Sequence, residues 1–182
     1  PVYNGRSYYT FRLGNIWGLV LDGGQYLNDD HPVFGNKFRH RELRIEETEY
    51  IKEVIKNAEE EYEAPDIQWR IIICHIPYTH VQQPPCDVDP DIFSQWNQLI
   101  NTHIKPHFVL SGHLHSTVLS YPGSSLDTLG QGCPVIVGAK HEQDQGQITN
   151  YIGCALTLDK PLVNVRFTDA NHKIHFDETF SV

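Results

Sequence analysis

The stretch Phe108-Val109-Leu110-Ser111-Gly112-His113-Leu114-His115 leads from an apolar run into a glycine turn that carries two histidines. The apolar run predicts a short buried strand, and Gly112 frees the backbone where that strand ends. Two imidazoles separated by one residue can both reach into one site, and imidazole is the commonest metal ligand among side chains. The stretch therefore predicts a metal site at a strand end.

A second strand upstream also ends in histidine. Residues 70–74 read Arg-Ile-Ile-Ile-Cys, a run typical of a strand buried on both faces. His75 follows it directly, and Pro77 marks the turn beyond. A lone histidine at a strand end is more often hydrogen-bonded to backbone than bound to metal. Open α/β sheets nevertheless bind ligands at the carboxyl ends of their strands, so we expect His75 to join His113 and His115 as metal ligands.

The composition is that of a folded globular domain. The chain has 182 residues, of which 40% are hydrophobic and 11% aromatic, enough for one domain with a core. Its formal net charge of -9 argues against general nucleic-acid binding, which needs clustered Lys and Arg. No apolar run approaches the roughly 18 residues of a membrane span. An anionic substrate would therefore need a local cation, which a metal ion would supply.

The four cysteines show no spacing typical of a metal site or a redox motif. They are Cys74, Cys86, Cys133 and Cys154, and no C-x-x-C pair occurs among them. We expect unpaired thiols, with a disulfide between one pair left open as an alternative.

Apolar runs, continuous or alternating, predict the strands. They lie at residues 8–13, 16–22, 70–74, 108–110, 134–138, 152–158, 163–167 and 174–176. A tight turn at Gly14-Asn15 joins the first two, and the second is apolar on both faces, so we expect it to be central. Residues 169–171 are expected to form the last hairpin turn.

Apolar spacings of three and four residues predict two helices. One amphipathic helix is expected over residues 42–62, ended by Pro65. Pro90 is expected to open the second, which runs to Ile100. No repeat or flexible linker separates these elements, so we expect one domain or one piece of a larger one.

Together, the two strand-end motifs resemble a known family. The order Cys74-His75-Ile76-Pro77, then a helix and a strand, then Gly112-His113-Leu114-His115 resembles the last two motifs of the calcineurin-like metallophosphoesterases. The strands before these motifs resemble the same family, so the likeness covers roughly residues 6–140. It implies a mixed α+β fold: part of a two-sheet β-sandwich flanked by helices, with residues 1–140 in the catalytic fold and 151–182 as a β-rich tail of the same unit.

The resemblance also implies a dinuclear metal site that hydrolyses phosphate mono- or diesters. By position, His75 and His113 match ligands of one ion and His115 a ligand of the other. An aspartate and a hydroxide bridge the two ions in that family. Imidazole and carboxylate ligands suit Mn, Zn, Fe or Ni without choosing among them. The expected substrate is a phosphorylated small molecule or protein.

Three earlier motifs of the family are not found in this sequence. They are an Asp-x-His, a Gly-Asp with the bridging aspartate, and a Gly-Asn-His with the proton donor. Asp29-Asp30-His31 and Asn171-His172 share letters with two of them, but neither follows a buried strand, and we interpret both as coincidences. We therefore expect the C-terminal part of a hydrolase, inactive and at most partly metal-loaded by itself. The alternative is a non-catalytic binding or interaction module that keeps the fold.

Three further residues are candidate substrate contacts. Tyr78 and His80 follow the turn at Pro77, and His141 follows the predicted strand at 134–138. For Asp22, at the end of a predicted central strand, we favour a structural role in capping the next loop.

Overall fold

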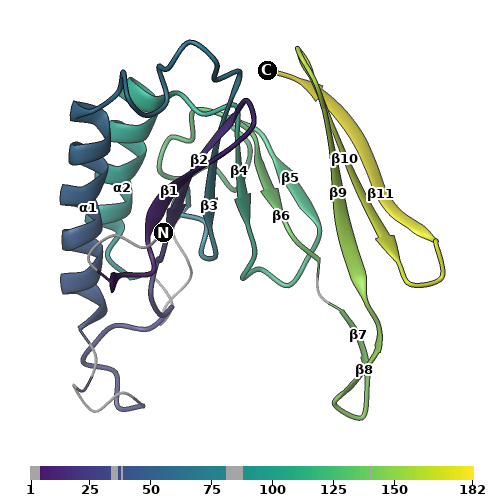
Figure 1. The fold of residues 1–182 in the computed structure, drawn as a ribbon. Helices are drawn as coiled ribbons and strands as arrows, with labels where there is room; N and C mark the ends of the chain where they lie inside the picture. The colour runs from purple at the N-terminus through teal and green to yellow at the C-terminus, as the bar shows by residue number, and fades with distance from the viewer. Residues whose placement is uncertain (1–4, 34–36, 38, 81–87, 140) are drawn as a thin grey trace.

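The computed structural model describes residues 5–33, 37, 39–80, 88–139 and 141–182, which form three layers (Figure 1). A six-stranded sheet lies in the middle, two helices cover one face, and a three-stranded sheet lies over the other. A short β-hairpin, β7 (Glu142–Asp144) and β8 (Gln147–Asn150), extends from the edge of this assembly. The fold is thus mixed α+β, as expected from the sequence.

The central sheet has the strand order β1-β2-β3-β4-β6-β5. Its members are β1 (Tyr9–Leu13), β2 (Ile16–Leu21), β3 (Trp69–Cys74), β4 (Phe108–Ser111), β5 (Val118–Ser120) and β6 (Val135–Val137). Strands β2, β3, β4 and β6 are parallel, and β1 and β5 pair antiparallel at the two edges. Parallel neighbours need crossover connections, and the two helices provide the first two of these.

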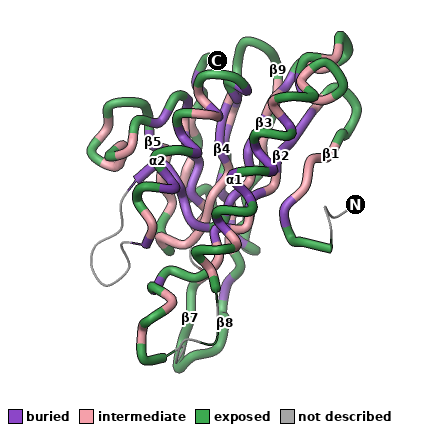
Figure 2. The backbone as a smooth tube through the Cα atoms, turned by 90° about the vertical axis from the view of Figure 1, so that its left-hand side faces the viewer, coloured by how far each residue is buried: buried purple, intermediate pink, exposed green. Residues whose placement is uncertain are grey.

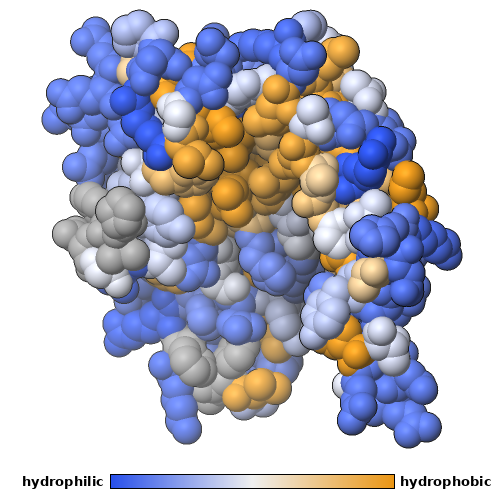
Figure 3. Space-filling view, turned by 45° about the vertical axis from the view of Figure 1, so that its right-hand side comes forward, coloured by the Kyte–Doolittle hydropathy of each residue, from blue (hydrophilic) through white to orange (hydrophobic). Residues whose placement is uncertain are grey.

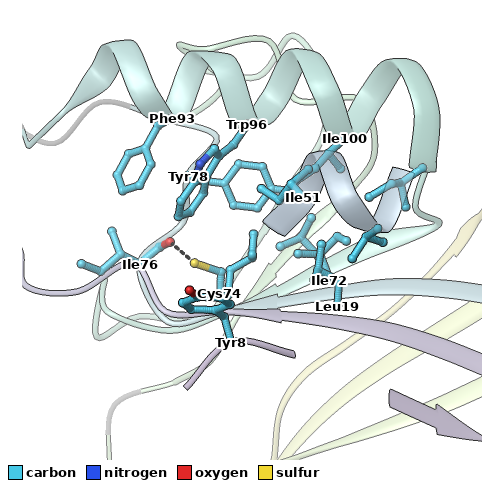
Figure 4. Close-up of a cluster of buried hydrophobic side chains, with 14 of the residues drawn as sticks. Tyr8, Leu19, Ile51, Ile72, Cys74, Ile76, Tyr78, Phe93, Trp96 and Ile100 are labelled. Carbon is cyan, nitrogen blue, oxygen red and sulfur yellow. Dashed lines mark hydrogen bonds between the residues drawn. The ribbon is translucent and has the colours of Figure 1, made fainter. Parts of the chain in front are cut away.

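The helices lie side by side on one face of the central sheet. They are α1 (His40–Lys56) and α2 (Pro90–Leu99), and α2 continues as a π-helical turn, Ile100–Ile104. Their apolar sides pack on alternate residues of β3, Ile72 and Cys74, in a core that also holds Ile51 and Trp96 (Figure 4). Buried residues follow the strands and the inner sides of the helices, whereas the β7–β8 hairpin is exposed (Figure 2).

The intervening residues of β3 face a second core. Trp69 and Ile71 pack there with side chains of the antiparallel three-stranded sheet β9 (Ile152–Asp159), β10 (Leu162–Asp169) and β11 (Ile174–Ser181). The period of two along a strand thus supplies both cores from one element. The predicted β-rich tail therefore shares a hydrophobic core with the central sheet.

Helix α1 ends earlier than the sequence pattern predicts. It ends at Lys56, and residues 57–64 form a series of hydrogen-bonded turns, in which the amide of Glu63 bonds to the carbonyl of Ala58 at 2.9 Å. Tyr62 is nevertheless buried and packs edge-on against Trp17 with ring centroids 5.4 Å apart. The apolar spacing correctly indicated which residues are buried, but the expectation that Pro65 ends the helix was wrong.

The structure also bears on the cysteines and on the absence of an apolar run long enough to span a membrane. Cys74, Cys133 and Cys154 are free thiols, while Cys86 lies outside the described residues. Within the described ranges no helix is long and apolar enough to cross a membrane.

Candidate metal centre

The two histidine motifs meet because β3 and β4 are parallel neighbours. Ile73 pairs with Leu110 near the carboxyl ends of these strands. Two residues further on, the amide of Gly112 donates a hydrogen bond to the carbonyl of His75 at 3.0 Å. The backbone pairing therefore continues past both strands and fixes the two motifs side by side at the carboxyl ends of β3 and β4.

Gly112 gives the imidazole of His75 the space that it occupies. A Cβ at residue 112 would lie 3.0 Å from Nδ1 of His75, closer than ordinary van der Waals contact. Without that Cβ, the rings of His75 and His113 approach to 5.6 Å between centroids, nearly perpendicular at 83°. The glycine thus allows the two imidazoles to become neighbours.

The turn after Gly112 is held in an unusual backbone conformation. His113 and His115 have φ angles of 66° and 52°, in the left-handed region that side chains other than glycine rarely adopt. Leu114 between them packs against the core under the helices and so anchors the turn. Strain of this kind persists where the surrounding structure enforces it, and it concentrates at functional sites.

His80 is a fourth histidine in the same neighbourhood. It is buried, and its Nε2 has no hydrogen-bond partner among the residues that the structure describes. Burial, followed by the nearby charge of His113, lowers the pKa of His80. The pKa of His113 is lowered by burial and then by His75 and His115. Both imidazoles therefore favour the neutral form, which is the form that binds metal ions.

Tyr26 was not anticipated at this site. Its ring centroid lies 5.4 Å from that of His113, and 41% of the residue is exposed. The loop that carries it follows β2, which ends at the same edge of the sheet as β3 and β4. That position was the only sequence signal, because a tyrosine among Gly, Gln and Leu has no distinctive pattern.

Two of the candidate substrate contacts lie away from the histidines. Tyr78 points into the core, 1% exposed, with its ring 6.2 Å from that of Trp96 (Figure 4). His141 packs against Tyr151 at 5.0 Å between ring centroids, and its Nδ1 accepts a hydrogen bond from the amide of Ile152. Only His80 of the three lies beside His113.

Asp29, in a stretch that shares letters with a family motif, and Asp22 both have structural roles. Both oxygens of Asp29 accept backbone hydrogen bonds, from the amides of His40 and Arg41 at the start of α1. Asp22 accepts from the Ser7 hydroxyl and from the Gly24 amide at 3.0 Å, so it caps the loop after β2 as expected. His172 lies in the turn between β10 and β11. The carboxylates of Asp22 and Asp29 are therefore engaged as hydrogen-bond acceptors for the backbone.

The donor set present fits one side of a metal site. His75 and His113 supply two adjacent imidazoles, but no group of three or more His, Cys, Asp or Glu within the described residues is placed to hold an ion. A cavity of about 320 Å³ lies beside them, between Ile73–His75 and Leu110–Gly112. Ser111 Oγ at this cavity is buried without a hydrogen-bond partner. The remaining donors of a complete site would have to come from outside the described residues.

Two solved structures with a similar fold are those of phosphatases. The chain matches a purple acid phosphatase from yellow lupin (Lupinus luteus) with a TM-score of 0.50 at 12% identity, over 96% of this chain and 32% of that one. It matches a dimetal phosphatase from Danio rerio with a TM-score of 0.56 at 11% identity, over 96% of this chain and 60% of that one. The chain has a metallophosphoesterase-like fold.

The similarity to these phosphatases covers only part of their length and little of their sequence. No protein-family model and no curated protein matches this sequence. The metallophosphoesterase-like chain spans about a third of the lupin phosphatase and three fifths of the zebrafish one. At 11–12% identity the agreement lies in the order and pairing of helices and strands, and the roles of single residues have to be argued from the site itself.

Proposed function

We propose that this chain supplies the histidine side of the active site of a metal-dependent phosphoesterase. The observation that carries the proposal is the contact of His75 and His113 across Gly112, at the carboxyl ends of two parallel strands. In the proposed site His75 and His113 bind one metal ion and His115 the second. Carboxylate ligands come from polypeptide outside this chain, because Asp22 and Asp29 hold backbone amides instead.

The chain's own residues would perform three tasks at this site. His75, His113 and His115 present imidazole nitrogens as donors, and Gly112 leaves room for the first of them. His80 has an unpartnered Nε2 beside His113 and is suited to hydrogen-bond a phosphate oxygen or a ligand. Metal ions held by these histidines would supply the acidity that lets coordinated water lose a proton near neutral pH.

An uncovered apolar cavity between the two sheets supports the proposal that this chain is part of a larger domain. An apolar cavity of about 240 Å³ opens there, lined by Leu110, Ile136, Leu156 and Phe167 among others. Figure 3 shows hydrophobic side chains gathered in a hollow of this face. Strand β9 forms the edge of its sheet, so its outer backbone groups have no neighbouring strand in the described structure. In the proposed parent, the polypeptide that carries the missing ligands covers this hollow.

Metal binding by the isolated chain tests the proposal. Titration calorimetry with Zn²⁺ and with Mn²⁺ should show weak binding of no more than about one ion per chain. His113→Ala should abolish it, and His75→Ala should weaken it at least about tenfold. His172→Ala is the matched control, because His172 is an exposed histidine that also has a left-handed φ, 64°. Equal loss in all three variants, or no loss in any, would refute the assignment.

A non-catalytic binding module with the same fold remains the second candidate. The absence of a three-donor metal group among the described residues favours it. This candidate predicts that His113→Ala lowers thermal stability without changing metal binding. The phosphoesterase proposal predicts the reverse, so one pair of measurements separates the two.

The proposal extends to domain organisation and substrate. Residues 1–140 and 151–182 are proposed to form one unit, because Phe108 of the first and Val165 of the second share a core. The substrate is proposed to be a phosphorylated small molecule or protein, and the metal ions are proposed to be Mn, Zn, Fe or Ni.

A further inference from the structure

A second pocket lies at the other end of the parallel strands, away from the histidines. Its volume is about 450 Å³, and it lies at the amino ends of β3, β4 and β6. The residues that matter for its chemistry are Arg70, Lys105, His107, Tyr121, Pro122 and Pro134. We propose that this pocket binds a small organic anion, a carboxylate or phosphate group carried on an apolar or aromatic body. The histidine site plays no part in this inference.

Arg70 is the first observation behind the proposal. Within the described ranges, every other arginine pairs with a carboxylate: Arg6 with Glu46, Arg12 with Asp66, Arg39 with Glu42, Arg41 and Arg44 with Asp89, and Arg166 with Asp177. Arg70 makes no such pair, although the chain carries a net charge of -9. An unpaired guanidinium at a partly buried position is suited to an external anion, which it can bind through two hydrogen bonds.

Lys105 adds a second cation on the same wall. It follows the π-helical turn with a left-handed φ of 51°, and no described carboxylate pairs with its ammonium group. The neighbouring Lys160 differs, because its ammonium group already donates to the Gln68 carbonyl at 2.9 Å. No Asp or Glu occurs among the residues lining the pocket. Among the described residues, no carboxylate forms an ion pair with either of these two positive charges.

His107 provides a neutral donor beside the two cations. Its amide donates to the carbonyl of Arg70 at 2.8 Å, and its Nδ1 accepts from the amide of Arg70 at 2.9 Å. Because Nδ1 accepts, the ring proton is on Nε2, which is then a donor. Burial, with the charges of Lys160 and Arg70, lowers the pKa of His107 to about 4. The ring is thus uncharged near neutral pH, and the same bonds fix Arg70 and His107 relative to each other.

The other walls of the pocket indicate what kind of body would carry the ligand's anionic group. Tyr121, Pro122 and Pro134 give rigid, largely apolar surfaces, and the Tyr121 hydroxyl is already bound to Glu178 at 2.7 Å. Burial raises the pKa of the Cys133 thiol to about 12, so this lining residue remains protonated. A thiol is nucleophilic only as the thiolate. The pocket is therefore suited to binding a ligand with an apolar body and not to covalent chemistry.

Calorimetric titration of the metal-free chain with phenylphosphonate and with benzoate tests this inference. At constant ionic strength we expect saturable binding of at least one probe, with one site per chain. Arg70→Gln and Lys105→Gln should each weaken it about tenfold, the size expected for one charge-assisted hydrogen bond. Preference for phenylphosphonate would indicate a phosphate ligand, and preference for benzoate a carboxylate.

Three controls make the result decisive. Lys173→Gln removes the same charge from an exposed turn and should leave binding unchanged. His113→Ala should also leave it unchanged, which separates this pocket from the histidine site. Arg70→Lys keeps the charge but not the planar fork and should retain part of the affinity. The inference is overturned if neither probe binds saturably, or if Arg70→Gln and Lys105→Gln bind as the parent chain does while their melting temperatures show that they fold.

Discussion

A methyl group at residue 112 would press on the imidazole of His75, at 3.0 Å from its Nδ1. We therefore expect Gly112→Ala to displace the His75 ring and to weaken Zn²⁺ binding about tenfold or more, with only a small change in melting temperature. Calorimetry and thermal unfolding measure the two effects. Gly153→Ala is the matched control, because nothing lies within 4 Å of its added Cβ. Unchanged Zn²⁺ affinity in Gly112→Ala would disprove this role of the glycine.

Glu47 is a buried carboxyl group whose charge state governs local stability. It is fully buried on α1, its Oε1 accepts from the Asp22 amide at 2.6 Å, and its Oε2 has no partner. Burial raises its pKa to about 9, well above the ordinary 4.5. A group with a raised folded pKa contributes stability that is fully present below the unfolded pKa and is lost as pH rises through the folded pKa. For Glu47 that window is pH 4.5 to about 9.

Replacing this carboxyl by an amide should remove the pH dependence. Glu47→Gln keeps an acceptor for the Asp22 amide but cannot ionise, so we expect it to stabilise the fold on the order of 2 kcal/mol at pH 8. The gain should be near zero at pH 5. Urea unfolding at the two pH values measures it, with the exposed Glu49→Gln as control. An equal effect at both pH values would show that Glu47 ionises normally.

Helix α1 begins at His40 with the help of a side chain eleven residues earlier in the sequence. Its preceding residue, Arg39, makes no side-chain cap, whereas Asp29 accepts hydrogen bonds from the first two helical amides. We expect Asp29→Ala to cost about 1 kcal/mol of unfolding free energy. Denaturant unfolding measures it, and Asp30→Ala at the exposed neighbour should change little. A loss in Asp30→Ala as large as that in Asp29→Ala would contradict the capping role.

Elements that bury a regular apolar face could be predicted from the sequence, and those that do not could not. Strands β2, β3, β4 and β9 and the start of α2 lie where their apolar patterns place them, within one or two residues. The three-residue strand β5 and the exposed β7–β8 hairpin were missed because so short or polar a segment carries no periodicity. The end of α1 was missed because turns at residues 57–64 bury Tyr62 as a helix would.

The positions of the strand-end histidines could be predicted from the sequence, as the strands themselves could. The sequence placed His75 and His113 at the ends of two strands and marked the turn at Gly112, and the two histidines meet because those strands are parallel neighbours in the structure. Tyr26 and the burial of His80 depend on how distant loops fold back, which no local pattern records. Tyr78 follows a turn next to a predicted site residue, yet its ring packs in the core against Trp96 of α2.

At the scale of the whole molecule, the hollow between the sheets leaves apolar surface uncovered. We expect the isolated chain to bind a hydrophobic dye such as ANS, and Leu156→Asn in the cavity wall to reduce the dye fluorescence about twofold or more. Leu162→Asn, an exposed leucine of the neighbouring strand β10 that does not line the cavity, should have little effect. If both variants reduce fluorescence equally, the dye does not report on the hollow.

The central claim, that His75 and His113 hold a metal ion together, is tested most directly by anomalous diffraction from crystals of the chain soaked in Zn²⁺. We expect one anomalous peak about 2.0–2.1 Å from a ring nitrogen of each histidine, absent in crystals of His113→Ala. A peak found only at surface histidines such as His172, with none between His75 and His113, would contradict the account.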